Sequence, residues 1–110
     1  MPRYVLLHHD WPTPHWDLFL EAGCVLRAWR LLESPRPDVD IPATANRDHR
    51  LHYLDYEGPV SGGRGTVTRI AEGSYEGELG ETWRVKWNGG WATISAGPTG
   101  LIFRWSDLLE

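Results

Sequence analysis

Apolar and polar residues alternate along most of this chain, in short segments. The clearest segment is HWDLFLE at 15–21, where Trp16, Leu18 and Leu20 share one face and the residues between them share the other. Because successive side chains on a strand point to opposite faces, this segment predicts a strand with one apolar face. The dipeptide AG that follows it and the apolar segment CVLRAWRLL at 24–32 predict a hairpin.

Similar segments continue to the end of the chain. The other predicted strands are 4–8, 51–58, 66–70, 83–87, 91–95 and 101–105. Turns are predicted at 59–65, within 74–82, at 88–90 and at 97–100, where glycine is frequent. The segment 33–48 carries three prolines and no sustained period, which predicts a long irregular loop with at most one helical turn. The last residues, SDLLE, fit a short helical end.

About seven short strands without a convincing amphipathic helix indicate an all-β sandwich or small barrel. Of these, we predict a small compact closed or partly closed β-barrel of short antiparallel strands with little helix. The chain of 110 residues has the length of one domain, so we expect a single domain over 1–110. Hydrophobic residues make up 41% of the chain and include seven tryptophans, which is enough for a core.

Composition also restricts the cellular compartment and the binding partners that we expect. The apolar runs are too short to span a membrane, and the first residues lack the apolar stretch of a secretory signal. One cysteine, Cys24, allows no internal disulfide, so we expect a reducing cytoplasm. A net charge of −4 argues against non-specific affinity for nucleic acid, which depends on neutralising phosphates.

The segment HHDWPTPHWDL at 8–18 is the first candidate for chemistry. His15 and Asp17 are two residues apart on a predicted strand, so their side chains share a face. His9 ends the preceding strand, and the short loop between them is stiffened by two prolines. Two imidazoles and one carboxylate leave coordination positions open, as in catalytic metal sites. The alternative is that these histidines, His8 included, only form hydrogen bonds at strand ends.

A second candidate is the segment RDHRLHYLDYEG at 47–58. A period of two places His49 and Tyr53 on one face, with Arg47 and Arg50 close in sequence. This set can bind a phosphate or supply a proton. In the alternative reading, the tyrosine is a core or interface aromatic residue.

Together these segments carry a resemblance to a known family. HDWPTPHWDLFLE, VLRAWRLLESP, DHRLHYLDYEG and GRGTVTRI occur in the order and at the spacing of the 3′-phosphoesterase domain of bacterial DNA ligase D. The chain resembles that domain family, including its short stand-alone relatives. The resemblance implies a compact β-barrel with a divalent metal, usually Mn²⁺, with Zn²⁺ or Co²⁺ as alternatives. It also implies removal of 3′-terminal phosphates and ribonucleotides from DNA primer-templates in break repair, with a DNA ligase or repair complex as partner.

Carried over to this chain, the resemblance assigns a role to each candidate. It makes His9, His15 and Asp17 the metal ligands. His49 would contact the scissile phosphate as an acid or transition-state stabiliser, and Tyr53 would hydrogen-bond a phosphate oxygen. Arg47 and Arg50 are candidates for substrate binding. We therefore expect a metal-dependent phosphoesterase.

The chain departs from the family pattern at three cationic positions. Phe19 stands where the family has the arginine of H-x-D-x-R, and Glu33 replaces the lysine of a PKGP-like turn. A further family arginine falls near Ile41 by spacing. Arg47, Arg50 or Arg64 are candidates to compensate. A lost charge-assisted clamp costs on the order of a few kcal/mol of transition-state binding, which makes weak catalysis an expectation.

Two other classes stay open. The first is a catalytically inactive metal-binding or nucleic-acid-interaction module on the same barrel, in which Trp11 and Trp16 stack on bases. The second is a non-haem iron oxygenase, with His15, Asp17 and a distal histidine such as His49 or His52. The chain is short for a jelly-roll oxygenase with a second cosubstrate pocket.

Overall fold

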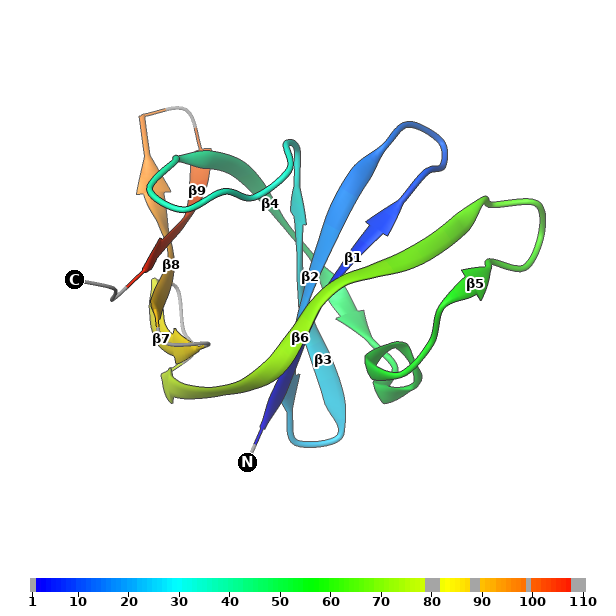
Figure 1. Ribbon diagram of the computed structural model, residues 1–110, viewed down its shortest axis with the longest axis horizontal. Coiled ribbons are helices and arrows are strands. Elements are labelled where there is room, and N and C mark those ends of the chain that lie inside the picture. The colour runs from blue at the N-terminus through cyan, green and yellow to red at the C-terminus, as the bar shows by residue number, and fades with distance from the viewer. Residues whose placement is uncertain (1, 79–81, 88–89, 99, 108–110) are drawn as a thin grey trace.

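The computed structural model describes residues 2–78, 82–87, 90–98 and 100–107. These residues form nine strands and one short 3-10 helix, η1 (Figure 1). The elements are β1 (Arg3–His9), β2 (His15–Ala22), β3 (Val25–Leu31), β4 (Ile41–His49), η1 (Leu51–Leu54), β5 (Gly58–Pro59), β6 (Thr66–Glu78), β7 (Trp83–Trp87), β8 (Gly90–Gly97) and β9 (Gly100–Asp107).

The strands close into a barrel. The sheet order is β1-β2-β3-β4-β9-β8-β7-β6-β5, all neighbours are antiparallel, and β1 also pairs with β6. The β1–β6 pairing completes a ring of hydrogen bonds through eight strands, and β5 lies outside this ring. The long strand β6 crosses the molecule, with β5 near its start and β7 near its end (Figure 1). The predicted antiparallel β-barrel with little helix is confirmed.

Alternating side chains of β1 and β2 enter two different cores. Tyr4, Leu6, Leu18 and Leu20 belong to the barrel core, to which all eight ring strands contribute. The remaining members of this core are Trp29, Leu31, Ile41, Ala43, Tyr75, Trp83, Val85, Ala92, Ile94 and Phe103. The intervening residues point to the outer face of the sheet.

A second core covers this outer face. It consists of Val5, Leu7, Phe19, Leu26, Ala28, Leu54 and Val67. Leu51 and Tyr53 of η1 and Val60 after β5 pack against it. The segment from η1 to β6 therefore forms a cover over β1, β2 and β3, and the space beneath this cover contains the candidate site.

The irregular segment expected at 33–48 is confirmed for 33–40, but it is wrong from Ile41 on, where β4 begins. Ile41 and Ala43 are buried, while Pro42 and Thr44 between them are exposed. The alternation is present, but alanine, asparagine and proline give it little β-propensity. Pairing with β3 on one side and β9 on the other stabilises the strand, so tertiary context overrides local preference.

The expected strand at 51–58 was also wrong. Leu51–Leu54 form a 3-10 turn, in which the amide of Tyr53 donates to the carbonyl of Arg50 (3.2 Å). Its one buried residue is Leu54, which packs in the outer core. Leu51 and Tyr53 also pack against this core, so the apolar residues of the segment are buried from a 3-10 turn and not from a strand.

Several turn predictions fall partly outside the described residues. Gly23 has a φ of 66° and forms the β2–β3 turn with the next residue, as expected. Residues 79–81, 88–89, 99 and 108–110 are not described, so the turns and the helical end predicted there are only partly covered. Within the range 74–82, β6 continues to Glu78, and at the C-terminus Ser106 and Asp107 belong to β9 rather than to a helix. In the described part of the chain, no helix is long and apolar enough to cross a membrane.

Two adjacent leucines provide a test of the barrel core. Leu31 is fully buried, while Leu32 is 54% exposed. We expect Leu31→Ala to lower the free energy of unfolding by about 2–5 kcal/mol, because it leaves a cavity in the core. The matched change Leu32→Ala should stay within about 0.5 kcal/mol of the unmodified chain in urea unfolding. Equal losses for the two variants would contradict this placement of β3.

Candidate metal centre

The β1–β2 register brings three candidate ligands to one face. His9 pairs directly with His15 across the two antiparallel strands, and Asp17 lies two residues further along β2, opposite Leu7. Side chains at directly paired positions and at i, i+2 share a face. This is the outer face, on which Leu7 and Phe19 enter the outer core. The site therefore lies on the outer wall of the barrel, not in its interior.

The three side chains converge. Their potential ligand atoms all lie within 4.8 Å of one another. Asp17 Oδ2 lies 3.3 Å from His15 Nε2 and 3.8 Å from His9 Nδ1. Two ligand atoms that share a tetrahedral ion at about 2 Å lie about 3.4 Å apart, so these separations suit a single metal ion.

Backbone carbonyls orient both imidazoles. His15 Nδ1 lies 2.9 Å from the carbonyl oxygen of Thr13, and His9 Nε2 lies 2.7 Å from that of Arg64. A carbonyl oxygen only accepts, so each of these ring nitrogens donates a hydrogen. In the neutral rings, the lone pairs are then on His15 Nε2 and His9 Nδ1, the two atoms that face Asp17.

The donor set fits a divalent cation. His15 is 3% exposed, and its Nε2 is buried without a hydrogen-bond partner. A buried lone pair that faces a carboxylate oxygen is unfavourable unless a cation lies between them. Imidazole and carboxylate are ligands for zinc, manganese and iron, and three protein ligands leave positions for water or substrate.

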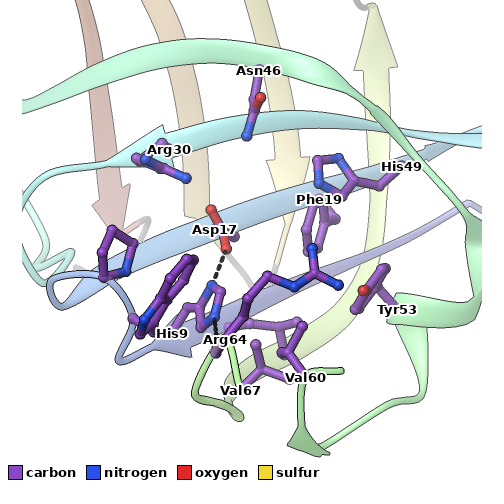
Figure 2. A pocket seen from close by; sticks show the side chains of 13 residues that line it. His9, Asp17, Phe19, Arg30, Asn46, His49, Tyr53, Val60, Arg64 and Val67 are labelled. Carbon is purple, nitrogen blue, oxygen red and sulfur yellow. Dashed lines mark hydrogen bonds and ion pairs between the residues drawn. The ribbon is translucent and has the colours of Figure 1, made fainter. Parts of the chain in front are cut away.

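A cleft of about 200 Å³ opens beside these residues (Figure 2). His9 and Asp17 line it, whereas His15 is buried next to it. The other polar groups in its wall are Arg30, Asn46, His49, Tyr53 and Arg64. The apolar lining consists of Leu7, Phe19, Val60 and Val67, with Trp11 and Pro12. The open side of the ligand group thus faces a space bordered by hydrogen-bond donors.

A β-bulge turns His49 toward the cleft. Leu26 pairs with His49 and Ala28 pairs with Asn46, so two residues of β4 stand opposite one residue of β3. Asn46 and His49 therefore both line the cleft although they are three residues apart. His49 Nδ1 donates to the carbonyl of Arg47 (2.8 Å), so in the neutral ring the lone pair is on Nε2.

Phe19 contacts both predicted catalytic side chains. Its ring centroid lies 4.9 Å from that of His49 and 6.0 Å from that of Tyr53. Phe19 is only 3% exposed and belongs to the outer core. The residue that replaces the family arginine therefore packs behind the two polar rings and supplies no charge.

The 3-10 helix that carries Tyr53 is tied to β1. Arg3 donates to Asp55 Oδ1 at 2.8 Å, and this hydrogen bond lowers the pKa of the Asp55 carboxyl. The carboxylate stays ionised to a lower pH than usual, so this exposed contact persists further into the acid range than an unpaired aspartate would allow.

Close backbone contact brings the loop before β6 to His9. Gly65 has a φ of 77°, and a Cβ there would lie 2.5 Å from Trp11 Cβ. The amide of Thr66 donates to Asp10 Oδ1 (2.8 Å), and the amide of Asp10 donates to the carbonyl of Thr66 (3.3 Å). A glycine at this position lets the segment after β1 and the segment before β6 approach each other closely. This approach places the Arg64 carbonyl at the His9 ring.

The structure brings His9, His15, Asp17, His49 and Tyr53 together at or beside the cleft, while their roles stay predictions. The separate candidates Arg47 and Arg50 are exposed and do not line the cleft, so their role stays a prediction. Two of the three cationic positions lost from the family pattern also lie outside the cleft. Ile41 is in the barrel core, and Glu33 pairs with Arg36 at 3.6 Å.

Sequence reasoning missed Arg30 and Asn46. Arg30 lies two residues after Ala28 on β3, so the two side chains point to the same face of the strand. Ala28 is in the outer core. This spacing is visible in the sequence, but neither the apolar pattern of 24–32 nor the family motif in it assigns a role to Arg30. Asn46 could not be placed, because the segment 33–48 was expected to be irregular.

Fold and side chains define a small antiparallel β-barrel with a candidate metal centre on its outer wall. Residues 7–99 match the DNA Ligase D 3′-phosphoesterase domain family, and the chain belongs to this family. It is similar to the multifunctional non-homologous end joining protein LigD of Pseudomonas aeruginosa, with 35% identity over 63 residues. The match covers 56% of this chain but 8% of that protein. The family resemblance expected from the sequence is confirmed.

Histidines on opposite faces of the β1–β2 pair allow a test of the metal centre. His15→Ala should lower the affinity for Mn²⁺ or Zn²⁺ by at least about 100-fold in calorimetric titration, because it removes a ligand. Asp17→Asn, which keeps the size of the side chain, should also weaken binding. His8→Ala is the control, because the His8 side chain points to the opposite face of β1 from His9. Its ring centroid lies 5.1 Å from that of Trp16.

Circular dichroism should show that the variants keep the fold. Undiminished metal affinity in folded His15→Ala would exclude the site.

Proposed function

We propose that this domain is a metal-dependent phosphoesterase that acts on 3′-terminal phosphate or ribonucleotide ends of DNA in end repair. Membership of the family supports a phosphoesterase role in end repair. The observation that carries the proposal is the convergence of two imidazole lone pairs and one carboxylate beside a cleft whose other polar groups are mainly hydrogen-bond donors. A phosphoryl group concentrates negative charge on its oxygens, and such a cleft is complementary to that charge.

His9, His15 and Asp17 would hold the metal. Mn²⁺ is our first choice, with Zn²⁺ or Co²⁺ as alternatives, because imidazole and carboxylate ligands suit all three. When bound, the ion supplies Lewis-acid chemistry toward a phosphate oxygen. The carbonyls of Thr13 and Arg64 keep the two imidazoles in the tautomers that expose their lone pairs.

His49 and Tyr53 would act on the phosphoryl group. The Nδ1 hydrogen of His49 is used by the Arg47 carbonyl, so a proton transferred to the leaving oxygen would come from Nε2. The Tyr53 hydroxyl would donate to a non-bridging oxygen. Phe19 would keep both rings in place by packing behind them.

The partners follow from the same proposal. We expect the substrate to be the 3′ end of a DNA primer-template. A DNA ligase or repair complex is the expected protein partner, since the similar region belongs to a multifunctional end joining protein. We expect the cytoplasm as the compartment, because the one cysteine, Cys24, is free and exposed.

A second candidate is a metal-binding or nucleic-acid-interaction module without catalysis. The observation that favours it is the buried, uncharged Phe19 in place of the family arginine. Exposed Trp11 at the cleft would then stack on a base. In the oxygenase alternative, the ligand set needs His49 or His52, whereas the group found in the described residues contains His9.

Phosphate release tests the proposal. The purified protein should release inorganic phosphate from a 3′-phosphate-ended primer-template with Mn²⁺ and not with EDTA. His49→Ala should lower the rate by about 100-fold or more, because a positioned acid contributes about that factor.

The control for this assay is His8→Ala, which removes an imidazole outside the cleft and should leave the rate unchanged. Stoichiometric Mn²⁺ binding without phosphate release would favour the inactive module instead.

A further inference from the structure

Arg30 is an arginine of the cleft for which the described residues provide no carboxylate partner. It lies on β3 directly opposite Asp17, and it lines the cleft (Figure 2). Its Nε is buried and has no hydrogen-bond partner. Within the described residues, no carboxylate lies within ion-pair distance of Arg30. In that part of the chain, other arginines that do have such a carboxylate are Arg3, Arg27, Arg36, Arg69 and Arg104.

The comparison with Arg69 shows what is unusual. Arg69 Nε is also buried without a partner, but Arg69 Nη1 lies 3.9 Å from Glu57 and 3.6 Å from Glu72. Arg30 has no such compensation. A buried donor next to a cleft is favourable when a ligand in the cleft accepts its hydrogen bond.

The position of Arg30 next to the ligand group adds a charge argument. With neutral imidazoles, Asp17 contributes the one negative charge of that group, so a divalent ion leaves it positive. Two like charges beside each other are unfavourable unless an anion lies between them. A phosphate meets this condition, because its oxygens can contact an ion and a guanidinium at once.

Arg64 adds a second cation from the other side of the cleft. In Figure 2, Arg30 extends from β3 and Arg64 from the loop before β6. Arg64 Nε donates to the carbonyl of Ser61 (2.7 Å) and Nη2 to its hydroxyl (3.1 Å), so this guanidinium is fixed without a carboxylate. Arg30 also borders a neighbouring hollow along Thr44, Ala45 and Asn46, through which a ligand can reach it.

We propose that Arg30 is a substrate-binding residue that donates hydrogen bonds to the terminal phosphate of the DNA. It would supply from β3 the positive charge that the family pattern places at the position of Phe19. This proposal rests on the proposed function, since it takes the phosphate end of DNA as the ligand. It also goes further, because it identifies the residue that selects a 3′-phosphate over a 3′-hydroxyl.

The test compares two primer-templates that differ only in a 3′-phosphate or a 3′-hydroxyl. Binding is measured by fluorescence anisotropy under two conditions: in EDTA, where no turnover occurs, and with Mn²⁺ at short times on ice, where the ion is present beside Arg30. The unmodified protein should prefer the 3′-phosphate. Arg30→Gln should weaken binding of that DNA by about tenfold and binding of the 3′-hydroxyl DNA by less than about twofold, because one charge-assisted contact is lost. Arg30→Lys should retain part of the preference.

Arg27→Gln is the matched control, because it removes one arginine from the same strand outside the cleft. It should bind both DNAs as the unmodified protein does. Metal content and circular dichroism should be unchanged in all variants.

The two proposals fail in different ways. If the unmodified protein releases phosphate but Arg30→Gln keeps its KM and its preference, Arg30 is not the phosphate-binding residue and the proposed function stands. If the unmodified protein prefers the 3′-phosphate through Arg30 but releases no phosphate, the binding role stands and the phosphoesterase is excluded. Absence of any preference for the 3′-phosphate in the unmodified protein overturns the role of Arg30.

Discussion

The antiparallel pairing of β1 with β6 closes the ring of eight strands and also completes the candidate metal centre. Its last pair, His9 with Val67, holds the start of β6 beside the end of β1. The residues just before β6 therefore lie at the His9 ring, where the Arg64 carbonyl accepts the Nε2 hydrogen. Without this pairing, the barrel core would open and one imidazole would lose its orientation. Stability of the fold and geometry of the site thus depend on the same contact.

The location of the site on the outer wall explains how so short a chain accommodates both a core and a cleft. The barrel interior is filled with apolar side chains. The outer face of β1, β2 and β3 is covered by η1 and the segment around β5, which form a second core at one end and leave the cleft at the other. Phe19 lies at the boundary, since it belongs to the second core and also lines the cleft. An apolar residue there favours packing over charge, and in our proposal Arg30 supplies the positive charge that Phe19 lacks.

The sequence was sufficient where local patterns dominate. Alternation predicts β2 and its hairpin with β3, and the i, i+2 spacing with a short loop predicts the three candidate ligands. The sequence was insufficient where contacts between distant residues determine the local structure. β4 depends on its two neighbours, and His49 reaches the cleft through a bulge that no period of two reveals. The carbonyl of Arg64 acts on His9 across 55 positions, so its role required the closed barrel. Arg30 is an intermediate case. Its spacing from Ala28 in the sequence gives its face of β3, but only the folded structure shows that a cleft lies on that face.

The central claim is that His9 Nδ1, His15 Nε2 and Asp17 Oδ2 share one metal ion, and anomalous diffraction tests it most directly. Crystals of the protein soaked in MnCl₂ would be measured at the manganese absorption edge. The account predicts an anomalous peak about 2 Å from each of these three atoms, with the Thr13 and Arg64 carbonyls still bound to the opposite ring nitrogens. A peak at the other ring nitrogens, or manganese bound only elsewhere on the protein, would contradict it.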